Sequence, residues 1–119
     1  MATYVLVHGS ASGGFIYRPV AKLLREAGHT VYTPTLTGMG ERVHLMSPAV
    51  GLDTHIEDVV NILEFEDLRD VVIVGHSYTG MVITGVADRA PERVGHIVYM
   101  DATIPRDGEY TFYTLSDDG

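Results

Sequence analysis

Short apolar runs alternate along this chain with longer segments in which apolar residues recur every three or four positions. Four runs have the length and the turn-rich flanks of β-strands, at residues 4–7, 30–33, 71–74 and 96–100. The segments between them predict three helices, so the order of elements is βαβαβαβ. Because parallel strands are joined by right-handed crossovers, this order predicts an α/β fold with three layers: a parallel sheet of about four strands between helices.

The predicted helices have recognisable ends. The first begins at Pro19 and ends at Gly28. Its apolar positions are Val20, Leu23, Leu24 and Ala27. The second follows a polar loop, and the sequence THIE at residues 54–57 predicts a capping box at its start. Its apolar positions are Ile56, Val59, Val60 and Leu63. The third is expected over residues 75–90, and residues 101–119 are expected to form loop.

Composition narrows the class of protein. A length of 119 residues with 45% hydrophobic residues is typical of one folded domain, here residues 1–119. Eight Lys+Arg against sixteen Asp+Glu give a net charge of −8, which argues against nucleic acid as a partner. The absence of cysteine excludes disulfides and thiol nucleophiles. Neither a signal peptide nor a membrane-length apolar stretch is recognisable, so a cytoplasmic location without membrane contact is expected.

The turn after the third predicted strand carries a candidate nucleophile, Ser77, in the sequence VGHSYTG at residues 74–80. A serine on a strand-to-helix elbow projects its hydroxyl from the turn, and the helix N-terminal amides beside it are placed to stabilise an oxyanion. The alternative is an ordinary N-cap serine. Gly75, two positions before Ser77, favours the elbow.

A second turn, HGSASGG at residues 8–14, follows the first predicted strand. The carboxyl ends of parallel strands meet at one edge of a sheet, so the backbone N–H groups of Ser10 and Tyr78 are candidates for one oxyanion hole. A flexible loop or a phosphate-binding loop is the alternative. No Gly-Lys-Ser/Thr follows, the glycines do not match G-x-G-x-x-G, and no acid ends the second strand. Nucleotide binding is therefore not expected.

Three motifs in order resemble the α/β-hydrolase superfamily: LVHG at residues 6–9, YTPTLTGMGER at 32–42 and VGHSY at 74–78. The resemblance covers essentially the whole chain and is to the esterase-like branch akin to plant hydroxynitrile lyases and methyl esterases. It implies that Ser77 is the nucleophile and that the amides of Ser10 and Tyr78 form the oxyanion hole. It also implies that the four strands are the third to sixth of an eight-stranded sheet, in the local order second-first-third-fourth.

The chain departs from this family pattern at two points. The family's elbow is G-x-S-x-G, whereas Thr79 occupies the last position here, and its larger side chain is expected to crowd the elbow. The alternatives are that a small shift accommodates this side chain or that it spoils the geometry of the oxyanion hole. Members of the family are about twice as long as this chain, and their catalytic histidine follows the last strand. This sequence has no counterpart of that histidine. The chain is therefore expected to be a truncated domain, equivalent to the N-terminal half of an α/β hydrolase.

None of the six histidines is expected to act as the base for Ser77. His8 closes the first strand at the right edge of the sheet, where the family keeps a structural histidine, and His76 is expected to point away from the Ser77 hydroxyl. His55, in the first turn of a helix, is expected to be exposed. The remaining three lie at the far end of the sheet or in the long loop: His29, His44 and His96. Their spacing contains no zinc motif, and no metal is expected.

Asp101 directly follows the fourth predicted strand. Some branches of the superfamily take the acid of the catalytic triad from this point, so Asp101 is a candidate for that role. A solvated or turn-capping aspartate is the alternative.

These features predict a serine carboxylic-ester hydrolase acting on a small ester or acyl compound without a cofactor. A serine without a base is a poor nucleophile, so the chain alone is expected to be weak or inactive. The alternatives are a non-catalytic binding or assembly module of the same fold, and cyanohydrin or C–C lyase chemistry at the same serine. Because the fourth strand has an open edge, a homodimer or a complex with a complementary C-terminal fragment is also expected.

Overall fold

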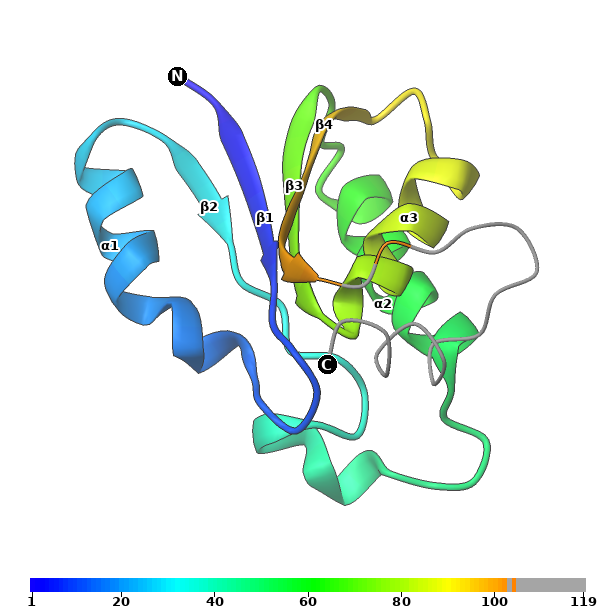
Figure 1. Ribbon diagram of the computed structural model, residues 1–119. Coiled ribbons are helices and arrows are strands. Elements are labelled where there is room, and N and C mark those ends of the chain that lie inside the picture. Colours follow the sequence, from blue (N-terminus) through cyan, green and yellow to red (C-terminus); the bar gives the residue numbers. More distant parts are fainter. Residues whose placement is uncertain (103, 105–119) are drawn as a thin grey trace.

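The computed structural model describes residues 1–102 and 104, which fold around one parallel sheet (Figure 1). The sheet has the strand order β2-β1-β3-β4. Its strands are β1 (Thr3–Val7), β2 (Thr30–Tyr32), β3 (Val71–Ser77) and β4 (Val94–Ala102). The helices are α1 (Arg18–Glu26), α2 (Leu52–Phe65) and α3 (Thr79–Arg89), with 3-10 segments η1 (Gly14–Tyr17) and η2 (Gly40–Leu45). The predicted fold class and strand order are confirmed.

The core has two sides because successive residues of a strand face opposite sides of the sheet. Val5 and Val7 of β1, with Ile73 of β3, pack under α2 and α3. Leu6 and Val74 face the other way and pack with Ala21 of α1. Figure 1 shows α1 on one side of the sheet and α2 and α3 on the other. The apolar run at residues 71–74 follows from this arrangement, since a parallel strand between two helical layers is buried on both faces.

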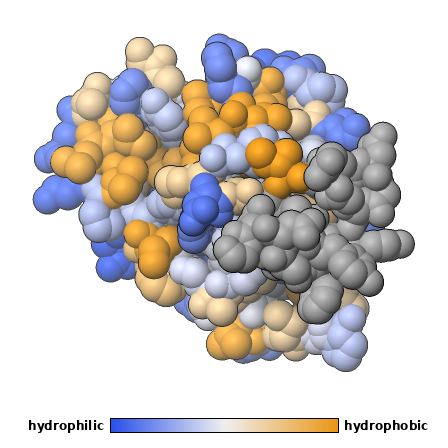
Figure 2. Space-filling model, viewed as in Figure 1, coloured by the Kyte–Doolittle hydropathy of each residue, from blue (hydrophilic) through white to orange (hydrophobic). Residues whose placement is uncertain are grey.

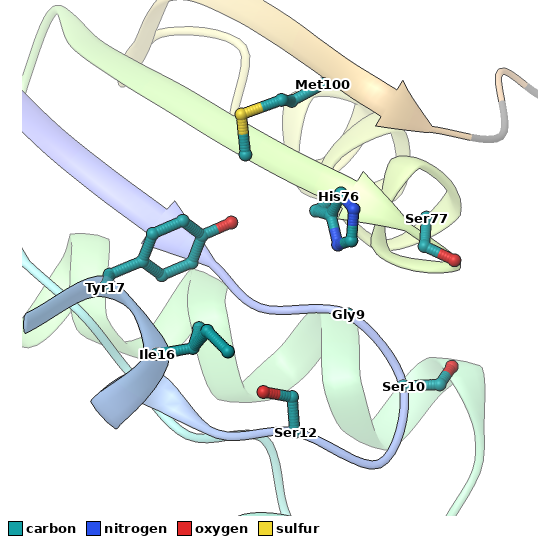
Figure 3. A pocket seen from close by; sticks show the side chains of 8 residues that line it. All are labelled: Gly9, Ser10, Ser12, Ile16, Tyr17, His76, Ser77 and Met100. Atoms are coloured by element: carbon teal, nitrogen blue, oxygen red, sulfur yellow. The ribbon is translucent and has the colours of Figure 1, made fainter. Parts of the chain in front are cut away.

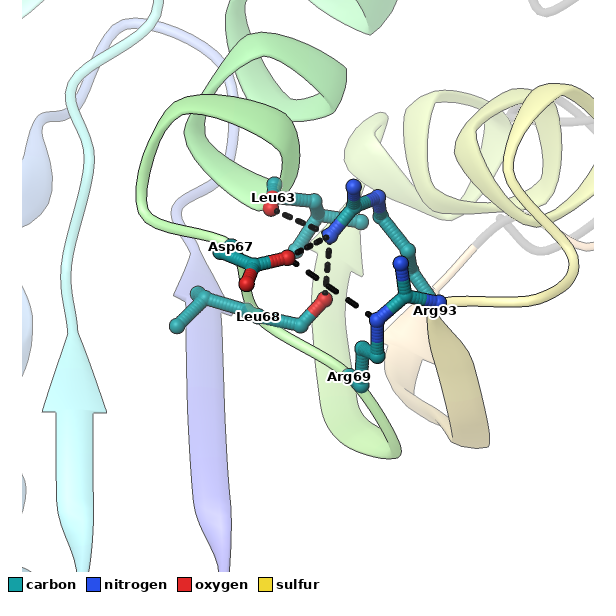
Figure 4. A network of polar contacts seen from close by, with 5 residues as sticks. All are labelled: Leu63, Asp67, Leu68, Arg69 and Arg93. Atoms are coloured by element: carbon teal, nitrogen blue, oxygen red, sulfur yellow. Dashed lines mark hydrogen bonds and ion pairs between the residues drawn. The ribbon is translucent and has the colours of Figure 1, made fainter.

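Arg93 fixes the C-terminal end of α2 (Figure 4). Its Nη1 donates to the carbonyl oxygens of Leu63 and Leu68 at 3.1 and 3.0 Å and to Oδ1 of Asp67 at 3.2 Å. The last carbonyls of a helix have no partner within the helix, and a cation satisfies them well. Arg93 therefore holds α2 against the connection between α3 and β4.

Two details of the helices differ from the sequence predictions. α2 begins at Leu52, and the hydroxyl of Thr54 accepts a hydrogen bond from the Gly51 N–H at 3.1 Å, so the predicted box at Thr54 is wrong and the helix starts earlier. On α1, Ala21 is buried whereas Leu23 is 67% exposed. The face that packs on the sheet follows Tyr17, Ala21 and Leu24 because these positions point toward Leu6 and Val31. Of the predicted apolar positions on this helix, only Leu24 packs against the sheet, and the others are exposed: Val20, Leu23 and Ala27.

β4 is an edge of the four-stranded sheet in the part of the chain that the structure describes. Its Ile97, Val98 and Met100 are 38%, 42% and 44% exposed. An apolar groove of about 290 Å³ runs between this strand and α1. Figure 2 shows hydrophobic side chains gathered over α1 and over the strands beside it. Within residues 1–102 and 104, no helix has the length and hydrophobicity needed to cross a membrane.

Candidate active site

Ser77 is the last residue of β3 and has a backbone φ of +56°. This left-handed conformation costs a residue other than glycine about 1–2 kcal/mol. The chain turns sharply there, and α3 begins at Thr79 with Tyr78 as its N-cap. Ser77 is therefore not the N-cap, and the strand, strained serine and helix have the geometry of a nucleophile elbow.

Two neighbours of Ser77 determine whether this turn fits against the rest of the sheet. A Cβ atom added to Gly75 would lie 2.8 Å from both the Thr79 carbonyl oxygen and Cδ1 of Ile83, so only glycine fits there. Thr79 itself is fully buried. Its hydroxyl accepts a hydrogen bond from the His76 N–H at 2.8 Å, and the carbonyl oxygens of His76 and Val7 lie 2.8 and 3.2 Å from it. The structure therefore accommodates Thr79 without crowding, because its hydroxyl joins the elbow to the end of β1.

Replacing Thr79 with valine is expected to destabilise the protein by about 1–3 kcal/mol, because the His76 N–H would lose its buried acceptor. Thr79→Ser retains the hydroxyl and is the matched control. The free energy of unfolding in urea measures both variants. Equal stability of the valine and serine variants would show that the hydroxyl does not hold the elbow.

The turn after β1 approaches the elbow closely. A Cβ atom added to Gly9 would lie 2.9 Å from Nδ1 of His76 and 3.5 Å from Cβ of Ser77. Ser10 and Ser77 line one pocket of about 320 Å³, together with Gly9, Ser12, Ile16, Tyr17, His76 and Met100 (Figure 3). In Figure 3 the His76 ring lies within this pocket, whereas the Ser77 hydroxyl points away from it at the rim. The sequence prediction placed Ser10 and Ser77 at the same edge of the sheet, and the structure brings them together.

Hydrogen bonds with the loop of residues 35–42 hold the turn after β1 in place. The Gly14 N–H donates to the Thr35 hydroxyl at 2.9 Å, and that hydroxyl donates to Oε2 of Glu41 at 2.7 Å. The bond from Thr35 is the largest contribution that lowers the pKa of the Glu41 carboxyl. Arg42 Nη1 donates to the Thr35 carbonyl oxygen at 3.0 Å. The polar residues of the motif at positions 32–42 therefore hold the loops in place and do not line the pocket.

His8 is completely buried at the end of β1. Its Nε2 accepts a hydrogen bond from the Leu36 N–H at 3.0 Å, so the ring proton lies on Nδ1 and is donated to the Gly9 carbonyl oxygen at 2.7 Å. Burial lowers the pKa of His8, and the ring is held neutral. Since both nitrogens are occupied, His8 is not placed to accept a proton from Ser77.

His55 is only 4% exposed, so its expected exposure is wrong. Its ring lies 3.0 Å from the Tyr78 hydroxyl through Nδ1 and 3.0 Å from the Thr37 carbonyl oxygen through Nε2. Sequence reasoning missed this contact with the residue that follows Ser77. His55 precedes the buried Val59 by four positions, so the two share one face of the helix. That spacing is the signal in the sequence from which the burial of His55 could have been predicted.

The other histidines also lie away from a base position. The Nδ1 of His29 accepts the Ala2 N–H at 2.9 Å, at the opposite end of the sheet. His44 is an exposed residue of η2, and His96 pairs with Val72 near the start of β4. None of the six histidines, all of which the structure describes, forms a hydrogen bond with the Ser77 hydroxyl.

Asp101 lies near the end of β4, at the same edge of the sheet as Ser77. It is exposed and has a φ of +47°, in an irregularity where Ser77 pairs with Ala102. In residues 1–102 and 104, no cluster of three or more histidine or acidic side chains is arranged to hold a metal ion.

The fold and the elbow together define a class of protein: parallel α/β proteins with a serine on a strained strand-to-helix turn. Residues 4–117 match the profile of the alpha/beta hydrolase family, and the chain belongs to this family. The resemblance inferred from the three sequence motifs is thus confirmed.

The relatives of the chain include several esterases. The carbendazim hydrolyzing esterase of Nocardioides sp. (strain SG-4G) is 55% identical over 109 residues, which cover 92% of this chain and 45% of that protein. A pyrethroid hydrolase of Sphingobium wenxiniae is 30% identical over 87% of this chain and 37% of its own length. Among solved structures, an extracellular alpha/beta-hydrolase from a Paenibacillus species has a TM-score of 0.85 and 34% identity, over 98% of this chain and 49% of that one. The chain therefore spans less than half the length of these relatives.

Proposed function

We propose that this chain carries the nucleophile and the oxyanion hole of a serine carboxylic-ester hydrolase. The φ of +56° at Ser77, on a turn packed against Gly9, is the observation that carries the proposal. Backbone strain of this kind persists only where the surrounding structure imposes it, and it is concentrated at functional sites. The similarity to a carbendazim hydrolyzing esterase and a pyrethroid hydrolase supports the same class of reaction.

In this mechanism the Ser77 hydroxyl oxygen attacks the carbonyl carbon of the ester, and its proton passes to a base. The carbonyl oxygen becomes an oxyanion, which the N–H groups of Ser10 and Tyr78 stabilise together with the positive end of α3. The bond to the alcohol then breaks, and the alcohol takes the proton from the base. Water attacks the acyl-serine by the same route, which releases the acid and restores Ser77.

The base is the missing part of this mechanism. His8 and His55 have both ring nitrogens in hydrogen bonds with other groups, and Asp101 is proposed only as the acid that would orient a base. An oxyanion hole without the triad retains about 10³–10⁴-fold acceleration over water. We therefore propose that the base comes from outside this chain. The chain alone is expected to hydrolyse esters weakly or not at all, while its oxyanion hole still allows slow reaction of Ser77 with a phosphonylating probe.

The substrate is proposed to be a small ester or acyl compound. Carbendazim is the first compound to test, because the relative that hydrolyses it is 55% identical to this chain. Location in the cytoplasm remains a prediction from the sequence.

Intact-mass spectrometry after incubation with a fluorophosphonate tests the proposal. We expect slow formation of a single covalent adduct on the chain and none on Ser77→Ala. Ser10→Ala and Ser12→Ala are controls for reaction at other serines of the pocket. An adduct that persists in Ser77→Ala, or none on the chain, would contradict the assignment of Ser77 as an activated nucleophile.

A second candidate function is a non-catalytic binding or assembly module. The occupied nitrogens of His8 and His55 favour it, since neither of these two rings is placed to take the proton of Ser77. Lyase chemistry at Ser77 would need the same base as the hydrolase. A chain without a fluorophosphonate adduct would support the binding module.

A partner that covers the edge of β4 is also proposed, either a second copy of the chain or a complementary C-terminal fragment. An open edge offers unpaired backbone groups to another strand, and Ile97 and Val98 add exposed apolar surface. We expect light scattering at micromolar concentration to detect a dimer that Val98→Lys weakens, because a charge on an edge strand opposes pairing. A stable monomer for the unmodified chain would contradict the homodimer.

A further inference from the structure

His55 and Tyr78 form a buried contact that the proposed mechanism does not use. His55 comes from α2, and Tyr78 is the residue between Ser77 and α3. The two rings meet edge to face, with centroids 5.8 Å apart and planes at 77°. The contact between His55 and Tyr78 therefore joins the elbow to α2, which is distant in the sequence.

The hydrogen bonds determine the direction of this contact. A carbonyl oxygen only accepts, so the Thr37 carbonyl requires a proton on Nε2 of His55, at 3.0 Å. In the neutral ring Nδ1 is then an acceptor, and it takes the hydrogen bond of the Tyr78 hydroxyl at 3.0 Å. Burial raises the pKa of Tyr78 to about 12, which keeps this hydroxyl protonated and able to donate.

The Thr37 end of the contact is itself anchored. The N–H and the hydroxyl of Thr37 donate to the two carboxylate oxygens of Asp58, both at 2.7 Å. Asp58 and His55 lie three positions apart on α2, so one face of this helix holds both ends of the Thr37 contact. Tyr78 is thereby connected through His55 to a loop that is already fixed.

We propose that His55 is a positioning residue that holds Tyr78, and with it the Tyr78 N–H and the Ser77 elbow, in the geometry of the oxyanion hole. The inference rests on the proposed function of Ser77. The Tyr78 side chain has its hydroxyl fixed at one end and its backbone adjoins the nucleophile at the other. A shift of the ring would therefore move the N–H that faces the oxyanion, and displacements of about 1 Å cost up to about 100-fold in rate.

The test measures phosphonylation of Ser77 by a fluorophosphonate in the 119-residue chain and in three variants: Tyr78→Phe, His55→Leu and the double variant. We expect each single substitution to lower the maximal labelling rate about 10- to 100-fold without changing the probe concentration at half-saturation. The double variant is expected to be no slower than the slower single variant, because both remove the same contact. His55→Gln, which retains a donor and an acceptor, is expected to restore part of the rate.

Tyr99→Phe is the matched control. It removes the hydroxyl of another tyrosine, which lies 2.7 Å from the hydroxyl of Thr84, five positions after the start of α3 at Thr79. It is expected to lower the melting temperature without changing the labelling rate. If His55→Leu and Tyr78→Phe slow labelling no more than Tyr99→Phe does, the contact contributes stability only and the inference is overturned.

A second readout does not depend on reactivity of Ser77. Amide NMR shifts of Ser77, Tyr78 and Thr79 are expected to move in His55→Leu and to stay in place in Tyr99→Phe. If the unmodified chain forms no adduct, the proposed function fails, and these shifts alone decide whether His55 positions the turn. Unchanged shifts in His55→Leu would overturn the inference.

Discussion

The Ser10→Pro variant is expected to lose about 100- to 1,000-fold in the rate at which Ser77 reacts with a fluorophosphonate, the usual effect of removing one oxyanion-hole donor. Proline has no backbone N–H, so the substitution removes the proposed donor itself. The Ser10 side chain is exposed and the residue lies in the turn that lines the pocket with Ser77. Loss of side-chain packing is therefore a minor part of the expected effect.

Ser10→Ala separates the backbone donor from the side chain, because alanine retains the N–H. It is expected to react at the rate of the unmodified chain. The melting temperature of both variants shows whether the turn remains folded. If the proline and alanine variants react at equal rates, the Ser10 N–H does not contribute to the oxyanion hole.

Replacing Gly14 with alanine is expected to destabilise the protein by at least about 3 kcal/mol, at the upper end of the cost of overpacking. The added Cβ atom would lie 2.0 Å from the Thr33 carbonyl oxygen and 3.1 Å from that of Pro34. Both obstacles are backbone atoms, so no side chain is able to turn aside. The shift would also strain the hydrogen bond from the Gly14 N–H to the Thr35 hydroxyl.

Gly51→Ala is the matched control for Gly14→Ala. A Cβ atom at Gly51 meets nothing within 4 Å, and its φ of −151° is extended backbone that alanine adopts. Its free energy of unfolding in urea is expected to change by less than about 1 kcal/mol. Similar losses in the two variants would mean that the turn of residues 9–14 adjusts to the extra atom.

Much of the fold was predictable because its signals are local. Continuous apolar runs and helical spacing placed the four strands and the three α-helices of the described residues. β3 and β4 extend beyond their predicted ends, α3 begins at Thr79 and not at residue 75, and the 3-10 segments η1 and η2 were not predicted. The pattern failed on α1, where which residues are buried depends on Leu6 and Val31 of the neighbouring strands. Helical spacing in the sequence identifies a band of apolar residues on the helix, but the position of the sheet decides which of these residues are buried.

The candidate site also contains residues that the sequence predicted and residues whose role it did not predict. Ser77, Ser10 and Tyr78 could be found from motifs, because a strand-to-helix turn and a glycine-rich turn at one sheet edge are recognisable in sequence. The effect of Thr79 could not be predicted from the sequence. It depends on the contact between the Thr79 hydroxyl and the Val7 carbonyl oxygen, and Val7 is 72 positions away in the chain. The burial of His55 depends in turn on the loop at Thr37.

The sequence by itself therefore determined the order of elements, the parallel sheet and the serine at the elbow, since each follows from residues close together in the chain. Only the tertiary structure decided that Thr79 fits, that His8 and His55 are occupied by other partners, and that Tyr78 is tied to α2. These outcomes depend on hydrogen bonds between distant segments. Such bonds form or fail according to distances of a few tenths of an ångström, which residue types and spacing do not encode.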